Sequence, residues 1–163
     1  MKGLVAALLF IALTACSTPA PAPGSTDQIR ELAAHIQRLS PIVDPDEASR
    51  AAEVAYAATF ALAQAYQITD PHKIHTAKVN AGQRPRGLCY HWAEDMEARL
   101  NLEGFETLEM TRAIANAQNV LLIEHSTAVI TAKGSPMEDG IVLDPWRKGG
   151  SLYWSTVAQD RRY

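Results

Sequence analysis

The spacing of apolar residues changes near the middle of the chain, and this change restricts the folds that the sequence can adopt. Residues 29–39 and 45–68 carry apolar side chains at helical intervals, and the second stretch is rich in alanine, which suits close helix packing. From residue 107 onward, apolar and polar residues alternate, or short apolar runs stand between turn sequences. Helices followed by strands predict an α+β fold with an antiparallel sheet.

Three helices are expected in the first part of the chain. A capping-box sequence at residues 25–28 precedes the first helix, and a proline-containing start at residues 44–46 precedes the second. The third spans about residues 88–102. Residues 72–87 have weak periodicity and many polar side chains, so they are expected to form a long loop ahead of the third helix.

Four strands and one shorter run are expected in the second part. Turn sequences rich in glycine, proline and aspartate separate them. The resulting sheet is expected to pack on the helix at residues 88–102. The strands are expected at residues 107–114, 125–131, 141–143 and 151–154, with a short buried run at residues 120–123.

Residues 1–15 have the features of a bacterial signal peptide. A short positive start precedes an apolar run at residues 3–12, which is too short to span a membrane as a mature helix. The sequence Leu13-Thr14-Ala15-Cys16 resembles the lipobox of bacterial lipoproteins, which implies cleavage before Cys16 and a lipid on that cysteine. The alternative is an ordinary secretory signal that is cut near Ala15. Both alternatives export the mature chain.

The lipobox resemblance also implies a location and a partner. Ser17 follows the cysteine, which in Gram-negative lipoproteins favours the outer membrane, with the protein facing the periplasm and held by its lipid. Residues 16–25 are rich in proline and alanine and are expected to form a tether, and residues 26–163 have the length of one domain. The formal net charge is −3 and no basic run occurs, which argues against nucleic acid as a partner.

Cys89 is the one remaining cysteine if Cys16 carries a lipid, so the exported chain holds a free thiol. It follows Gly87 and falls in the first turn of an expected helix, where the helix N-terminus stabilises the nucleophilic thiolate. His125 begins one expected strand and Asp144 ends the next. Neighbouring antiparallel strands would bring these two side chains together, and the helix packed on the sheet would present Cys89 to His125.

Three motifs together resemble the transglutaminase-like superfamily of papain-type folds. The resemblance implies that Cys89 is the nucleophile, His125 the general base and acid, and Asp144 the orienting carboxylate. It implies a protease, amidase or transglutaminase-like acyltransferase that acts on an amide bond of a protein or peptide without a cofactor. Leucine stands directly before the nucleophile, which leaves the substrate preference open. The motifs are Gly87-Leu88-Cys89-Tyr90, His125 at a strand start, and Leu143-Asp144-Pro145-Trp146.

Gln83 is a further candidate for the site. It precedes Cys89 by six residues, which is the spacing of the oxyanion-hole glutamine in papain-like proteases, and the alternative is a solvated loop residue. His91 is excluded as the base, because on a helix it points about 200° away from Cys89. No second cysteine or acidic residue completes a metal site with His72 and His75, so no metal is expected.

Simpler interpretations remain for these residues. Cys89 could be a small buried side chain, His125 a surface residue at a strand end, and Asp144 part of a plain turn. The whole domain could then be a binding module without turnover, and a peptidoglycan endopeptidase of the NlpC/P60 kind is a third possibility. Two further groups of side chains flank the motifs. The tryptophans are expected in the core or in cleft walls, and the arginines are expected in solvent, with contact to a substrate carboxylate as the alternative: Trp92, Trp146 and Trp154, and Arg84, Arg86 and Arg147.

Overall fold

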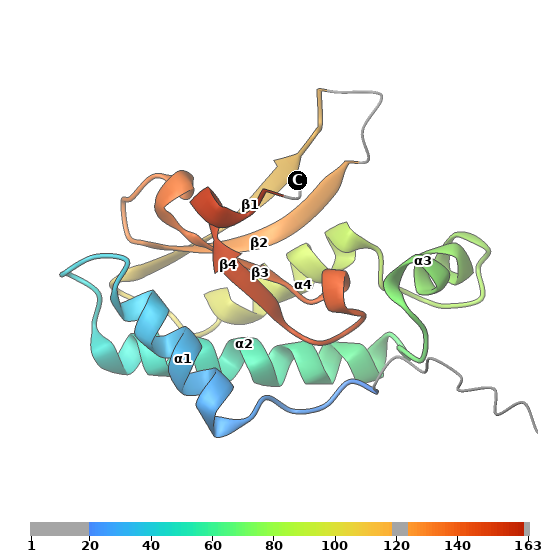
Figure 1. Ribbon diagram of the computed structural model, residues 1–163, viewed down its shortest axis with the longest axis horizontal. Coiled ribbons are helices and arrows are strands. Elements are labelled where there is room, and N and C mark those ends of the chain that lie inside the picture. Colours follow the sequence, from blue (N-terminus) through green and yellow to red (C-terminus); the bar gives the residue numbers. More distant parts are fainter. Residues whose placement is uncertain (1–19, 119–123, 162–163) are drawn as a thin grey trace, which may run out of the picture.

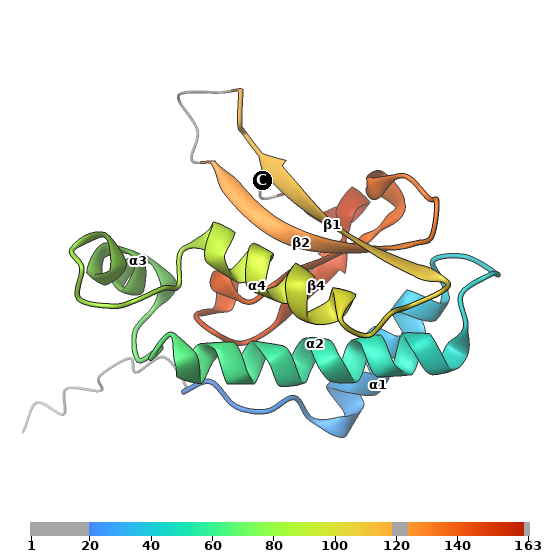
Figure 2. The same ribbon diagram turned by 180° about the vertical axis from the view of Figure 1, so that it is seen from behind.

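The computed structural model describes residues 20–118 and 124–161. In these ranges the chain forms four α-helices, three short 3₁₀ turns and one antiparallel sheet with the strand order β1-β2-β3-β4 (Figures 1 and 2). The expected α+β class is therefore confirmed. The signal peptide, Cys16 and the expected run at residues 120–123 lie outside the described residues.

The first two helices begin where the sequence predicts. In α1 (Thr26–Gln37), the Ser25 hydroxyl accepts from the Gln28 backbone N–H, and the Gln28 side chain accepts from the Ser25 N–H, as a capping box requires. In α2 (Pro45–Ala65), the Asp44 carboxylate caps the first turn. The alanines of α2 are largely buried, so α2 approaches its neighbours closely.

The expectation of a loop at residues 72–87 is wrong for its first half, which forms α3 (His72–Asn80). The helix starts directly after Pro71, and only one of its residues, His75, is buried. A helix that buries a single polar side chain has no apolar stripe, so periodicity does not reveal it. α3 stands at one end of the molecule, near the start of α4 (Cys89–Asn101) (Figures 1 and 2).

The sheet consists of β1 (Leu108–Ala115), β2 (His125–Ala132), β3 (Ile141–Asp144) and β4 (Tyr153–Thr156). The first three match the expected strands to within a residue, whereas the last begins two residues later than expected. Gly149 and Gly150 have φ angles of 61° and 91°, so the chain turns there in a conformation that favours glycine. β4 starts where the returning chain pairs with β3, at Asp144 and Tyr153.

α1, α2 and α4 lie on one face of the sheet. α4 packs on β2, α2 packs on α4, and α1 packs on α2 (Figure 2). In β2 the side chains alternate, so Ala128 and Ile130 enter the core with the helices while Thr127 and Val129 face the other side. Further core residues come from all layers: Leu32, Ile36, Met96, Leu100, Leu108, Ile141 and Leu143.

The described part of the expected tether, residues 20–25, runs along the domain. Gly24 lies so close to the Tyr56 ring that a Cβ at this position would overlap it. Pro21 lies near Gly150 in the turn before β4. Across the described residues, every helix is too short or too polar to cross a membrane.

Candidate active site

Cys89 is the first residue of α4 and is half-buried. The helix starts here because Leu88 is extended and Gly87, with a φ of 123°, adopts a conformation that is essentially restricted to glycine. The His91 ring caps this start: its Nδ1 accepts from the backbone N–H of Gly87 at 3.2 Å and of Leu88 at 3.3 Å. His91 is thus a capping residue, and its Nδ1 faces the chain before the thiol.

Side chains from α3 and α4 hold the segment that leads into Cys89. The buried His75 ring donates from Nε2 to the carbonyl oxygen of Arg86 at 2.9 Å, and a Cβ at Gly87 would overlap the same ring. The Arg86 guanidinium binds both carboxylate oxygens of Asp95, at 2.8 and 3.2 Å. The expectation that Arg86 is simply solvated is therefore wrong. Both contacts fix the backbone from which the thiol projects.

His125 and Asp144 meet inside the protein. His125 is the first residue of β2, and Ala128 of β2 pairs with Leu143 of β3, which brings Asp144 diagonally opposite His125. The His125 Nε2 and the Asp144 Oδ2 lie 2.7 Å apart, and each residue is 2% exposed. A carboxylate in this position fixes both the orientation and the tautomer of the imidazole. Cys89 is a further interaction partner of this ring.

The Cys89 thiol and the His125 ring are close enough for each to shift the pKa of the other. Burial works against ionisation of the thiol, but the hydrogen bond with His125, the Ser126 backbone N–H and the charge of His125 hold the pKa of Cys89 below its ordinary value. Burial also works against a charged His125 ring, but Asp144 and Cys89 raise the pKa of His125 to about 9. Both shifts favour a thiolate–imidazolium pair.

Trp146 covers the His125 ring. The centroids of the two rings are 5.0 Å apart, and the indole Nε1 donates to the Thr76 hydroxyl at 3.2 Å. The His72 ring packs edge-on against the same indole at 4.5 Å. Trp146 also packs against the core cluster that contains Trp92, which is one of the roles expected for the tryptophans. α3 supports both halves of the site, through His75 at the Cys89 side and through His72 and Thr76 at the His125 side.

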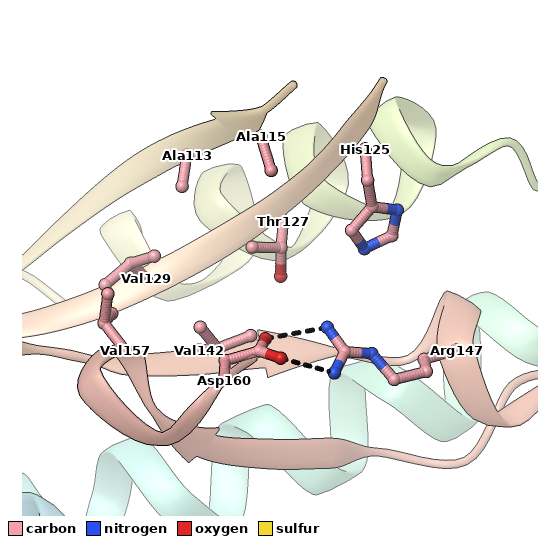
Figure 3. Close-up of a pocket in the computed structure, with 9 residues that line it drawn as sticks. All are labelled: Ala113, Ala115, His125, Thr127, Val129, Val142, Arg147, Val157 and Asp160. Atoms are coloured by element: carbon pink, nitrogen blue, oxygen red, sulfur yellow. Dashed lines mark hydrogen bonds and ion pairs between the residues drawn. The ribbon is translucent and has the colours of Figure 1, made fainter. Parts of the chain in front are cut away.

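Arg147 is a residue whose role the sequence does not reveal. A solvated position was expected, yet Arg147 is only 6% exposed. Its backbone N–H and its Nε donate to Asp144 at 3.1 and 3.0 Å, and both terminal nitrogens bind Asp160 at 2.9 and 2.8 Å (Figure 3). The 3₁₀ turn at Trp146–Lys148 reverses the chain, so Arg147 contacts Asp144 three residues earlier. The i,i+3 spacing of Asp144 and Arg147 is the one sequence signal for this contact.

The structure does not bring every candidate to the thiol. Gln83 is exposed in the segment between α3 and α4, so its oxyanion role stays a prediction. The His75 ring is engaged with the Arg86 carbonyl, and the His72 ring with Trp146. Within residues 20–118 and 124–161, no group of three histidine, cysteine or acidic side chains is arranged to hold a metal ion.

No protein-family model matches this chain, and comparisons with curated proteins and with solved structures each find no match. The chemistry of the site must therefore be argued from its geometry. That geometry is a half-buried thiol at a helix N-terminus, an imidazole that interacts with it, and a buried carboxylate that holds the imidazole. A thiol in this setting is equipped for nucleophilic attack on a carbonyl group.

Proposed function

We propose that this protein is a cysteine hydrolase or acyltransferase that acts on an amide bond through Cys89, His125 and Asp144. The observation that carries the proposal is the His125 ring, which the Asp144 carboxylate holds at 2.7 Å and which lowers the pKa of the Cys89 thiol. The cysteine at a helix start, with the histidine and the aspartate on adjacent strands, supports a transglutaminase-like or papain-like core.

In the proposed reaction, His125 holds the thiol proton and Cys89 attacks as the thiolate. A bond forms between Sγ and the carbonyl carbon, and the oxyanion is held by backbone N–H groups at the start of α4, with Gln83 as a further proposed donor. The carbon–nitrogen bond then breaks while His125 protonates the leaving nitrogen. Water or a second amine, deprotonated by His125, attacks the thioester, releases the acyl group and restores the thiolate.

The proposed place of action is the cell envelope. The lipobox resemblance at residues 13–16 supports a lipid on Cys16 that anchors the protein to the outer membrane, with the domain in the periplasm. Envelope proteins, or the peptides of peptidoglycan, are the proposed substrates because they carry amide bonds in that compartment.

One observation favours a second candidate, a binding module that keeps the site without turnover. His125 is only 2% exposed, and Trp146 covers one side of its ring. A base that a substrate must reach is usually more open, although such sites tighten or open when a substrate binds. The two candidates differ in whether Cys89 ever carries an acyl group.

The test uses the full chain in detergent with two substrates, an unfolded protein such as casein and purified peptidoglycan. New amino termini are identified by mass spectrometry, with and without an added primary amine. Cleavage or amine incorporation that disappears in Cys89→Ala supports the proposal, and the substrate that reacts distinguishes a protease from a peptidoglycan endopeptidase. Identical products from the wild-type chain and Cys89→Ala would contradict catalysis by Cys89 and would favour the second candidate, the binding module.

A further inference from the structure

We infer that a small apolar pocket beside His125 receives an aliphatic side chain from the amine side of the amide that is cleaved. The inference rests on the proposed function and adds the substrate class. The pocket has a volume of about 100 Å³ and lies on the face of the sheet opposite the helices (Figure 3). None of its lining residues belongs to the helical core, so it is separate from the packing that stabilises the fold.

The walls of the pocket are small and apolar. Ala113 and Ala115 of β1, Val129 of β2 and Val142 of β3 line its base, and Val157 stands at the side (Figure 3). Alternation along each strand explains why these residues face this side, because their neighbours Ala128, Ile130 and Leu143 face the helices. The alanines of β1 keep open a space that a larger side chain would fill.

The volume limits the occupant. An apolar cavity of about 150 Å³ accepts a benzene molecule, so a pocket of about 100 Å³ suits a smaller group, such as the side chain of valine or leucine. The polar end of the pocket is formed by Arg147 and Asp160, which bind each other. Their opposite charges compensate one another, so a charged side chain would gain little there and would lose its hydration.

The position of His125 assigns the pocket to the amine side. Cys89 starts α4, which packs on the helical face of β2, whereas the pocket adjoins His125 on the opposite face. During acylation the acyl carbon is bonded to Cys89, and the leaving nitrogen must lie at the His125 ring to receive its proton. The chain beyond that nitrogen therefore continues past His125, toward the pocket.

Acyl transfer to added amines tests this assignment directly. The full chain is acetylated at Cys89 with p-nitrophenyl acetate, and the acetyl group then partitions between water and an amino-acid amide. Glycinamide, valinamide, leucinamide, phenylalaninamide and lysinamide are compared, and the acetylated products are quantified by mass spectrometry. We expect valinamide and leucinamide to capture the acetyl group at least fivefold more efficiently than the other three.

Two variants on one strand provide the contrast. Ala113→Leu fills the pocket, so the ratio of valinamide to glycinamide capture should fall to about one in that variant. Thr111→Leu, on the same face of β1 but not in the pocket lining, should keep the wild-type ratio. Equal capture of all five amides by an acetylated enzyme, or an unchanged ratio in Ala113→Leu, would overturn the inference alone. Failure of Cys89 to become acetylated would overturn the proposed function, and the inference with it.

Discussion

Arg147 and Asp160 form a bidentate ion pair, with both terminal nitrogens of the guanidinium on the two carboxylate oxygens at 2.9 and 2.8 Å. The same guanidinium donates from Nε to Asp144, which in turn holds His125. A residue near the end of the described chain is thus linked to the candidate base through one arginine. Since the side chains of Arg147 and Asp160 are at most 9% exposed, each charge depends on its partner for compensation.

Arg147→Ala should destabilise the fold. The substitution leaves the Asp144 and Asp160 carboxylates buried without their cation, and breaking a buried ion pair in this way typically costs roughly 3–5 kcal/mol. Urea denaturation followed by circular dichroism measures the loss. Arg30→Ala is the control, because the Arg30–Asp27 pair is largely exposed and such pairs contribute at most about 1 kcal/mol. Equal losses in the two variants would show that the buried network does not stabilise the protein.

Cys89 should react with iodoacetamide at a pH where an ordinary thiol does not. The pKa of Cys89 lies below its usual value mainly because His125 and backbone N–H groups outweigh the opposing effect of burial. At pH 6 the wild-type chain should therefore react at least tenfold faster than His125→Ala, in which the thiolate loses its partner. His35→Ala, a histidine substitution on α1, should react like the wild-type chain. Equal rates for all three proteins would contradict the thiolate–imidazolium pair.

Gly87→Ala should lower both the stability of the fold and the reactivity of the Cys89 thiol. Alanine would require a φ of 123° and would place a Cβ onto the His75 ring. Gly82→Ala is a matched control, since Gly82 also has a positive φ, of 71°, but its Cβ would meet nothing within 4 Å. The free energy of unfolding of this control should fall by about 1–2 kcal/mol, because alanine is strained at a positive φ.

The free energy of unfolding of Gly87→Ala should fall clearly further. Alkylation of Cys89 at pH 6 should also slow in this variant, because the start of α4 shifts. Denaturation and alkylation are measured on both variants. If Gly82→Ala and Gly87→Ala behave alike, contact with His75 does not position the thiol.

The raised pKa of His125 predicts how stability depends on pH once the thiol is removed. In Cys89→Ala, Asp144 still favours the charged ring, so His125 contributes stability that is fully present below pH 6.5, the unfolded value, and is lost as pH rises through its folded pKa. The difference in unfolding free energy between Cys89→Ala and the double variant Cys89→Ala/His125→Gln should shrink between pH 6 and pH 9. A difference that grows with pH would mean that burial, not Asp144, controls this histidine.

The elements that the sequence reveals are those with local determinants. The capping box at residues 25–28, the helical spacing in residues 29–39 and the alternation in residues 125–131 each act over a few neighbouring residues. The helix and the strand that they predict appear in the structure where they are expected. Cys89 at a helix start and His125 and Asp144 on neighbouring strands follow from the same signals. α3 does not, because its single buried residue, His75, makes its contacts with a separate segment of the chain.

Local residue patterns are thus enough to locate the thiol, its candidate base and the carboxylate behind it, and to predict the α+β class. The packed chain alone reveals that Arg147 is buried, that Asp160 binds it, that α3 supports both sides of the site, and that a small pocket adjoins His125. The reason is physical: a charged side chain can be buried only where partners from other segments compensate it, and a pocket exists only between strands that have already paired.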